Sequence, residues 1–303
     1  MLTRRQTLAT GLAAPALALT PRVTRAAGHE ASALPTNRAF QLGEFRVITL
    51  LDAHTARDDD PQSIFGMNVS EEEFDRVSQE NFISPEAGHF FFTPTLVDTG
   101  SERILFDTGL GQGGLITALS DAGYAPADIT HVVITHMHPD HVGGLMTDGA
   151  ATYAEAVHIT GQAEFDHWTA NPNDAVTNNV LPLQDQFQMI DDGAEVRTGI
   201  TAVAAFGHTP GHMTYMIESG GQQILLIADL ANHYVWSLGY PDWEVRFDMD
   251  KEAAAASRRR ILDMAATDRF PIIGYHMPFP AAGFVETRGE GFHYVPVSYQ
   301  FLG

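Results

Sequence analysis

Residues 132–144 read VVITHMHPDHVGG, which places three histidines and an aspartate within six residues, directly after a β-branched apolar run. While the chain is extended, His136 and His138 point the same way, so both can bind one metal ion. A proline then turns the chain and presents Asp140 and His141 to a second ion. Four such groups at the end of a buried strand are costly to bury without a metal, so the segment predicts a metal site.

Three more polar residues, each near the end of an apolar run, offer the ligands that such a site still needs. His208 comes soon after the run at 200–206, Asp229 ends LLIAD, and His276 ends IIGYH. Functional residues of layered α/β proteins collect at such strand ends. Each of the three alone is equally well explained as a hydrogen-bonded core residue or a helix cap. Together with the first cluster they complete a two-metal set, whose imidazole and carboxylate donors suit zinc, and also iron, manganese or cobalt.

The composition of the 303-residue chain favours the same chemistry by exclusion. Because the chain has no cysteine, disulfides, thiolate zinc ligands, iron–sulfur clusters and a cysteine nucleophile are excluded. Its single lysine, Lys251, stands at the start of an expected helix, and no glycine-rich phosphate-binding motif is present. The 38 acidic and 17 basic side chains give a net charge of −21, which argues against a nucleic-acid partner.

Apolar and β-branched runs predict strands in both halves of the chain with helices after them, a pattern that suits sheets covered on their outer faces by helices. The polar segment 55–89 is predicted to be a loop or lid over a site, with one short helix that Ser70 and Glu73 open as a capping box. Residues 28–40 are predicted to be a loose lead-in. The expected strands are 45–51, 90–97, 103–106, 131–135, 157–160, 200–206, 213–218, 223–228, 272–275 and 292–297, and the expected helices are 115–122, 162–170 and 251–266, the last capped by Asp250.

The N-terminal residues 1–27 are predicted to be an export signal. Arg4 and Arg5 precede an apolar run of 12 residues, 8–19, which is too short to span a bilayer, and small residues that offer a cleavage point follow it. TRRQTL resembles a twin-arginine signal, so the mature protein is expected to be a single domain, residues 28–303, in the periplasm. An N-terminal membrane anchor is the alternative, and no membrane association is expected once the signal is cleaved.

The chain closely resembles the metallo-β-lactamase superfamily over about residues 43–300. HMHPDH at 136–141 matches the HxHxDH signature of the family, and FDTG at 106–109 matches its early aspartate-containing turn. The candidate ligands after residue 200 follow in the family's order. The resemblance implies an α/β fold of four layers, an αββα sandwich, with the metals at one edge between the two sheets.

The resemblance also implies a role for each candidate ligand. By the family's pattern, Asp229 bridges two ions. Asp107 orients a ligand without binding metal, with a turn-capping aspartate as an equal alternative, and His212 is not a ligand. The first ion is held by His136, His138 and His208, and the second by Asp140, His141 and His276.

Within the superfamily, the chain looks most similar to methyl parathion hydrolase and its relatives and to the N-acyl homoserine lactone lactonases. The stretches that carry this likeness are ITHMHPDHVGGLM, GHTPGHMTYMIES and GEGFHYVPVSY. The lactonases have a tyrosine three residues after the bridging aspartate, where this chain has Asn232. Trp168 matches a pocket aromatic of the organophosphate enzymes, and a core tryptophan is an equal interpretation. The predicted function is therefore a dinuclear metal-dependent hydrolase of ester, lactone or phosphotriester bonds, with lactonase or arylesterase activity first and organophosphate hydrolase activity as the alternative.

The mechanism that the resemblance implies uses a metal-bound hydroxide, so no protein nucleophile is required. Asp140 is predicted to be catalytic, because it can orient the hydroxide or carry its proton as well as bind metal. His233 and Tyr234 are candidates for protonating the leaving group, and surface residues are the alternative interpretation. Six aromatic residues are predicted to supply an apolar pocket wall for a small hydrophobic substrate: Phe90, Phe91, Phe92, Trp168, Trp236 and Trp243.

A mononuclear iron redox enzyme of the same fold is the main rival hypothesis. Flavodiiron relatives usually carry a glutamate where this chain has His138, and the length leaves no room for a flavin domain. A nucleic-acid-processing role is opposed by the negative charge, and a non-catalytic scaffold role by a ligand set that looks complete. The expected partner is a small-molecule substrate. The sequence leaves the oligomeric state open, with a homodimer as one candidate.

Overall fold

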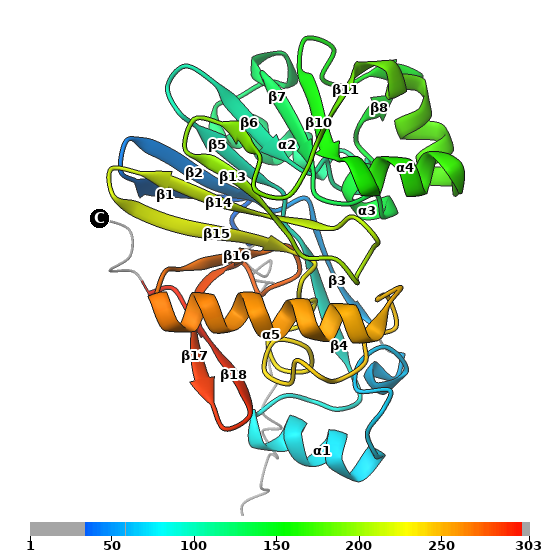
Figure 1. The fold of residues 1–303 in the computed structure, drawn as a ribbon, viewed down its shortest axis with the longest axis vertical. Helices are drawn as coiled ribbons and strands as arrows, with labels where there is room; N and C mark the ends of the chain where they lie inside the picture. Colours follow the sequence, from blue (N-terminus) through cyan, green and yellow to red (C-terminus); the bar gives the residue numbers. More distant parts are fainter. Residues whose placement is uncertain (1–33, 58, 299–303) are drawn as a thin grey trace, which may run out of the picture. The chain divides into compact units, whose positions relative to one another are not determined.

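The computed structural model describes residues 34–57 and 59–298. One compact unit, residues 35–303, carries every helix and strand given below (Figure 1). The predicted export signal, residues 1–27, lies outside the described residues and stays a prediction, as does a domain boundary at residue 28. Among the described residues, no helix combines the length and apolarity that a membrane span requires.

The first part of this unit forms a seven-stranded mixed sheet (Figure 1). Its strand order is β1–β2–β5–β6–β7–β10–β11, antiparallel as far as β6 and parallel from β6 to β11. Parallel neighbours need crossover connections, and these contain α2 (Gly114–Ala122) before β7 and α4 (Gln162–Ala170) before β11. The strands are β1 (Asn37–Leu42), β2 (Phe45–Leu50), β5 (Thr95–Asp98), β6 (Arg103–Phe106), β7 (His131–Ile134), β10 (Val157–Gly161) and β11 (Phe187–Ile190).

The second part forms another seven-stranded sheet, in which the strands follow one another in chain order from β12 to β18. Neighbouring strands are antiparallel except β15 and β16, which are parallel. The crossover between those two contains α5 (Lys251–Asp268), which Asp250 caps as predicted, because its carboxylate accepts a hydrogen bond from the Ala253 N–H. The strands are β12 (Glu195–Arg197), β13 (Ile200–Ala204), β14 (Met213–Ser219), β15 (Gln222–Ala228), β16 (Ile272–Gly274), β17 (Ala282–Arg288) and β18 (Gly291–Pro296).

Short elements connect and flank the two sheets. The helix predicted within the polar segment is α1 (Glu71–Glu80), and the Ser70 hydroxyl accepts a hydrogen bond from the Glu73 N–H at its start. Two small two-stranded sheets pair β3 (Ala53–Arg57) with β4 (Gly88–Phe92), and β8 (Met146–Thr147) with β9 (Ala150–Ala151). The remaining short helices are α3 (Pro139–Val142), η1 (Pro61–Ser63), η2 (Pro126–Asp128), η4 (Leu181–Gln186) and the π-helix η3 (Val176–Val180).

The side chains of β6 and β7 alternate between two apolar layers, as expected for a sheet that is covered on both faces. Ile104, Phe106 and Val133 belong to the large buried cluster shared with the second sheet, whereas Leu105 and Val132 pack with α2. Helix α5 contributes three buried residues to the large cluster: Ile261, Leu262 and Ala265. The layers are therefore helix, sheet, sheet and helix, and the predicted αββα sandwich is confirmed.

The single strand predicted at 90–97 is wrong, because two strands of different sheets occupy that range. β4 ends at Phe92 and pairs with β3, whereas β5 begins at Thr95 in the first sheet. The break includes Pro94, which has no N–H to donate to a strand neighbour. Its carbonyl oxygen accepts a hydrogen bond from the Leu50 N–H instead, at 2.8 Å.

The predicted set lacks seven of the strands in the described part of the chain, namely β1, β3, β8, β9, β11, β12 and β17. The predicted loose lead-in, residues 28–40, is wrong from Asn37 onward, because β1 begins there and forms the outer edge of its sheet. β3 is exposed along most of its length. Exposed edge strands carry polar side chains that interrupt the apolar pattern. Their strand character therefore comes from pairing with β2 and β4, which local sequence does not report.

Candidate metal centre

The candidate ligands lie where strands of both sheets end. His136 follows β7 of the first sheet, and His208 lies in the loop between β13 and β14 of the second. Asp229 comes directly after β15, and His276 comes shortly after β16. Because β15 and β16 are parallel neighbours, their carboxyl ends meet at one edge of the sheet. The backbone is strained at this edge, because Ala228 has a φ of +46°, a left-handed conformation that is unfavourable for an alanine.

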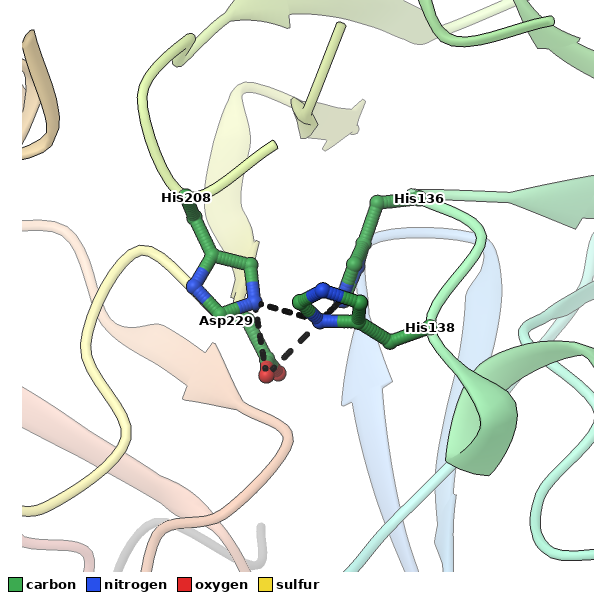
Figure 2. Close-up of side chains that lie close together, drawn as sticks. All are labelled: His136, His138, His208 and Asp229. Atoms are coloured by element: carbon green, nitrogen blue, oxygen red, sulfur yellow. Dashed lines mark hydrogen bonds and ion pairs between the residues drawn. The ribbon is translucent and has the colours of Figure 1, made fainter. Parts of the chain in front are cut away.

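Three imidazoles and one carboxylate converge in the first group of ligands (Figure 2). His138 Nδ1 lies 3.1 Å from His136 Nε2 and 3.0 Å from His208 Nε2. Asp229 Oδ2 lies 3.4 Å from His208 Nε2. Their ligand atoms all lie within 4.8 Å of one another, so this group can hold one metal ion.

The second group consists of Asp140, His141 and His276, and Asp229 faces it as well. Asp140 Oδ2 lies 3.5 Å from His141 Nε2 and 3.4 Å from His276 Nε2. Asp229 Oδ1 lies 3.3 Å from His141 Nε2, while its Oδ2 lies 3.1 Å from His276 Nε2. The structure thus brings together all seven residues that were predicted as ligands, with Asp229 between the two groups.

Two buried atoms in this cluster support the presence of a ligand between the groups. Among the described residues, the buried His141 Nε2 and Asp229 Oδ1 have ion-pair contacts, including the one of 3.3 Å with each other, but no hydrogen bond. Each such atom destabilises a folded protein by about 1–3 kcal/mol when nothing satisfies it. A divalent cation would satisfy both, and imidazole nitrogens with carboxylate oxygens are donors that such a cation accepts. The residues present therefore fit bound metal ions.

The pKa values of the histidines are shifted in opposite directions in the two ligand groups, lowered for His136 and His138 and raised for His141 and His276. Burial, together with the neighbouring His141, holds the pKa of His136 well below its usual value, and burial with His208 does the same for His138. Neutral imidazoles are the form that binds metals. Burial opposes charge on His141 as well, but the carboxylates of Asp229 and Asp107 outweigh it and raise the pKa of His141 well above its usual value.

Asp107 orients His141 rather than binding in the cluster itself. Its Oδ2 accepts a hydrogen bond from His141 Nδ1 at 2.8 Å, which leaves His141 Nε2 for the ligand group. Asp107 also accepts hydrogen bonds from the backbone N–H and the hydroxyl of Thr135, each at 2.9 Å. Of the two predicted alternatives, the structure thus supports an orienting aspartate.

A buried ion pair that the sequence analysis missed supports His208. Asp248 Oδ1 lies 3.0 Å from His208 Nδ1, and Asp248 Oδ2 accepts a hydrogen bond from Arg258 Nη1 at 2.7 Å. Both charged side chains are fully buried. One feature of the sequence points to a buried arginine here. Arg258 stands at helical spacing from Ala254 and Ile261 of α5, so it lies on the apolar face of that helix.

Glu164 of α4, also missed, joins the two loops that carry the histidines. Its Oε1 accepts hydrogen bonds from the Met137 N–H at 2.8 Å and from Trp168 Nε1 at 2.7 Å. Its Oε2 accepts from the Thr209 hydroxyl at 2.6 Å and from the Gly211 N–H at 2.9 Å. Trp168 is therefore a core residue that anchors Glu164. Nothing in the sequence distinguishes Glu164 from the many exposed acidic residues of the chain.

Hydrogen bonds also hold the backbone and side chain of Asp229. His212 Nε2 accepts a hydrogen bond from the Asp229 N–H at 3.1 Å, so His212 supports a ligand without being one. Asn232, which stands where the lactonases have a tyrosine, donates from its side-chain amide to Asp229 Oδ2 at 2.8 Å. His276 is held by its Nδ1, which donates to the Phe91 carbonyl oxygen at 2.7 Å.

A cavity of about 310 Å³ lies beside His276. Its wall is largely apolar, with Phe91 and Trp236 among the lining side chains, and the segment after α1 contributes Ile83 and Ala87. The predicted lid segment therefore does border the site. Four of the six predicted pocket aromatics are not among the cavity's lining residues: Phe90 and Trp243 are buried in a separate apolar cluster, Trp168 contacts Glu164, and Phe92 packs edge-on against His276.

Comparison with known sequences points to one family. Residues 93–271 match the model of the metallo-beta-lactamase superfamily. This range contains every candidate ligand except His276, which lies just beyond it. The N-acyl homoserine lactonase of Bacillus cereus is 26% identical over 197 residues, which cover 59% of this chain and 74% of that enzyme.

Solved structures agree with this comparison over most of the chain. AidC, a dizinc quorum-quenching lactonase, is 26% identical with a TM-score of 0.78, over 87% of this chain and 98% of AidC. AbOPH, a hydrolase of the beta-lactamase superfamily, is 22% identical with a TM-score of 0.80, over 88% of this chain and 99% of AbOPH. The second likeness shows the shared fold.

Proposed function

The chain belongs to the metallo-beta-lactamase superfamily, and on this premise we propose that it is a lactonase-type metallo-hydrolase that holds two zinc ions. The observation that carries the proposal is the convergence of five histidines and two aspartates beside a largely apolar cavity. When bound, two such ions supply Lewis acidity, which lowers the pKa of water and polarises a substrate carbonyl. The residues would hold them in the two groups described: His136, His138, His208 and Asp229 for one, and Asp140, His141, His276 and the shared Asp229 for the other.

Side chains of the protein transfer the proton and orient the ligands. Asp140 is the most accessible of the carboxylates in the cluster, with 21% of its side chain exposed, against 4% for Asp229. A carboxylate at the edge of the site can accept the proton of the attacking water and pass it on, so we assign this role to Asp140. Asp107 and Asp248 keep His141 and His208 in orientation while the charge of the site changes.

The cavity favours a small, uncharged and partly apolar substrate. Its volume of about 310 Å³ is at the lower end of the range for ligand sites, and its wall includes Ile83, Phe91 and Pro278. The net charge of −21 disfavours anionic substrates. A lactone with a short acyl substituent meets these conditions, and AidC, a lactonase, was solved with the product N-hexanoyl-L-homoserine.

The proposal is tested by a substrate panel on the purified chain after zinc loading, with the metal content measured in parallel. We expect N-hexanoyl homoserine lactone or a simple γ-lactone to be opened, about two zinc ions per chain, and loss of activity after chelation. Activity confined to methyl parathion, or confined to a β-lactam, would contradict the lactonase assignment. One iron per chain with no hydrolysis of any panel member would favour the redox alternative.

We also propose that the protein is exported through the twin-arginine route, on the strength of Arg4 and Arg5 before a short apolar run. Changing both to lysine is expected to leave an unprocessed precursor in the cytoplasm, whereas the unaltered chain is shortened and recovered from the periplasm. Cell fractionation with immunoblotting measures both forms. The matched control is Arg22→Lys with Arg25→Lys, which should export normally. Equal processing of all three chains would refute the proposal.

A further inference from the structure

His233 lies in the wall of the cavity beside His276, and its own turn holds its ring. The ring nitrogen Nδ1 accepts hydrogen bonds from the N–H groups of Val235 and Trp236, each at 3.1 Å. The Ser237 hydroxyl accepts from the His233 N–H at 2.9 Å and donates to the His233 carbonyl oxygen at 3.0 Å. Local hydrogen bonds therefore fix both the ring and the backbone of His233.

This arrangement selects one protonation state of the ring. A nitrogen that accepts two hydrogen bonds carries no proton, so the neutral ring holds its proton on Nε2. Protonation of Nδ1 would place its N–H against the two backbone N–H groups and break both bonds. Burial acts in the same direction and lowers the pKa of His233 to about 3.

Aromatic rings enclose the imidazole. The Trp236 ring is stacked on it at a centroid distance of 4.0 Å and an interplanar angle of 16°, and Tyr234 is stacked at 4.7 Å. Phe65 is tilted against it at 5.5 Å. The titratable groups that line the same cavity are His89, Tyr234 and His276. No carboxylate is among the described residues that line the cavity, so within that part of the chain the charged form of His233 has no anionic partner there.

We propose that His233 binds the substrate as a neutral hydrogen-bond donor and is not the acid that protonates the leaving group. Nδ1 is occupied by the turn, so Nε2–H is the one ring group left for an acceptor oxygen in the cavity. Such a donor recognises a carbonyl or ester oxygen of an uncharged substrate. This inference rests on the proposed function for the identity of the substrate, but the state of the ring does not.

Nitrogen-15 NMR of histidine-labelled protein tests the state of the ring without any substrate. The signals of His233 are identified by their loss in His233→Gln. We expect a neutral ring with the proton on Nε2, unchanged between about pH 5 and 9. A ring that titrates in this range, or one with its proton on Nδ1, would overturn the proposal even if lactones are hydrolysed.

Kinetics on the zinc-loaded enzyme test the binding role with two matched variants. His233→Gln keeps a side-chain N–H near the position of Nε2, whereas His233→Leu has no donor. We expect kcat/KM for N-hexanoyl homoserine lactone to fall about tenfold to a hundredfold in His233→Leu, mainly through KM, and within about threefold of the unaltered enzyme in His233→Gln. Both variants lose the Nδ1 acceptor, so equal melting temperatures show that their difference isolates the donor.

Two results would overturn the binding role. Equal losses in both variants would mean that the donor contributes nothing, and loss of the alkaline limb of the pH profile in His233→Gln would identify an acid instead. If the unaltered enzyme opens no lactone while the NMR result is as expected, the proposed function fails and the ring assignment stands.

Discussion

Replacing Asp229 by asparagine is expected to lower kcat/KM on a lactone by at least about a thousandfold. Stabilisation of the transition state by bound ions amounts to several kcal/mol, and about 1.4 kcal/mol corresponds to each factor of ten. Asp229 is the carboxylate that faces both ligand groups, 3.4 Å from His208 Nε2 of the first and 3.1 Å from His276 Nε2 of the second. The amide of asparagine keeps the size of the side chain but removes its charge. Zinc content measured by mass spectrometry is expected to fall together with activity.

The control for this variant is Asp263→Asn, which alters an exposed aspartate of α5. It should bind zinc and turn over substrate as the unaltered enzyme does. Near-normal activity of Asp229→Asn, with two zinc ions still bound, would show that the cluster is not the catalytic centre.

Replacing Arg258 by methionine is expected to lower the free energy of unfolding by about 3–5 kcal/mol, because one partner of a buried ion pair is removed. Arg258 donates to Asp248 Oδ2 at 2.7 Å and to the Pro241 carbonyl oxygen at 2.9 Å. Without it, His208 at 3.0 Å is the one side chain among the described residues that still pairs with the buried carboxylate. Urea unfolding of the metal-free protein measures the change, and Arg260→Met, exposed on the same helix, is the control.

The double variant Arg258→Met with Asp248→Leu separates folding from function. Removing both charges should recover much of the lost stability, since a buried ion pair is often replaceable by apolar residues. His208 then lacks the partner of its Nδ1, so zinc affinity should remain about tenfold to a hundredfold below normal. Recovery of both stability and zinc affinity would mean that Asp248 does not orient His208.

The core of the metal centre was predictable because its spacing is local. In HMHPDH, four side chains are placed relative to one another by a few backbone angles, and such residue types have little other reason to occur together. His208, Asp229 and His276 were predictable for a related reason, since each follows a strand that the sequence shows as an apolar run. Apolar patterns of the same kind also predicted α5 and most strands of the second sheet. They failed at 90–97, where pairing with two different sheets divides one apolar run.

The residues that line the cavity, by contrast, could not be predicted from the sequence. Phe90, Phe91 and Phe92 are chemically identical and adjacent, yet only Phe91 lines the cavity. Neighbouring side chains of β4 point to opposite faces of the strand. Pairing with β3 orients the strand so that Phe90 faces an apolar cluster and Phe91 faces the cavity.

The fold class and the seven candidate ligands were predictable from the amino-acid sequence, because metal binding demands rare combinations of residue types at short spacing. Which ordinary residues support those ligands depends on the three-dimensional fold. Asp248, Glu164 and His233 belong to common types, and each acquires its role from neighbours that the fold supplies: His208 forty residues away, the two histidine loops, and the cavity beside His276. A hydrogen bond or an ion pair depends on distance in space, and distance along the chain does not report it.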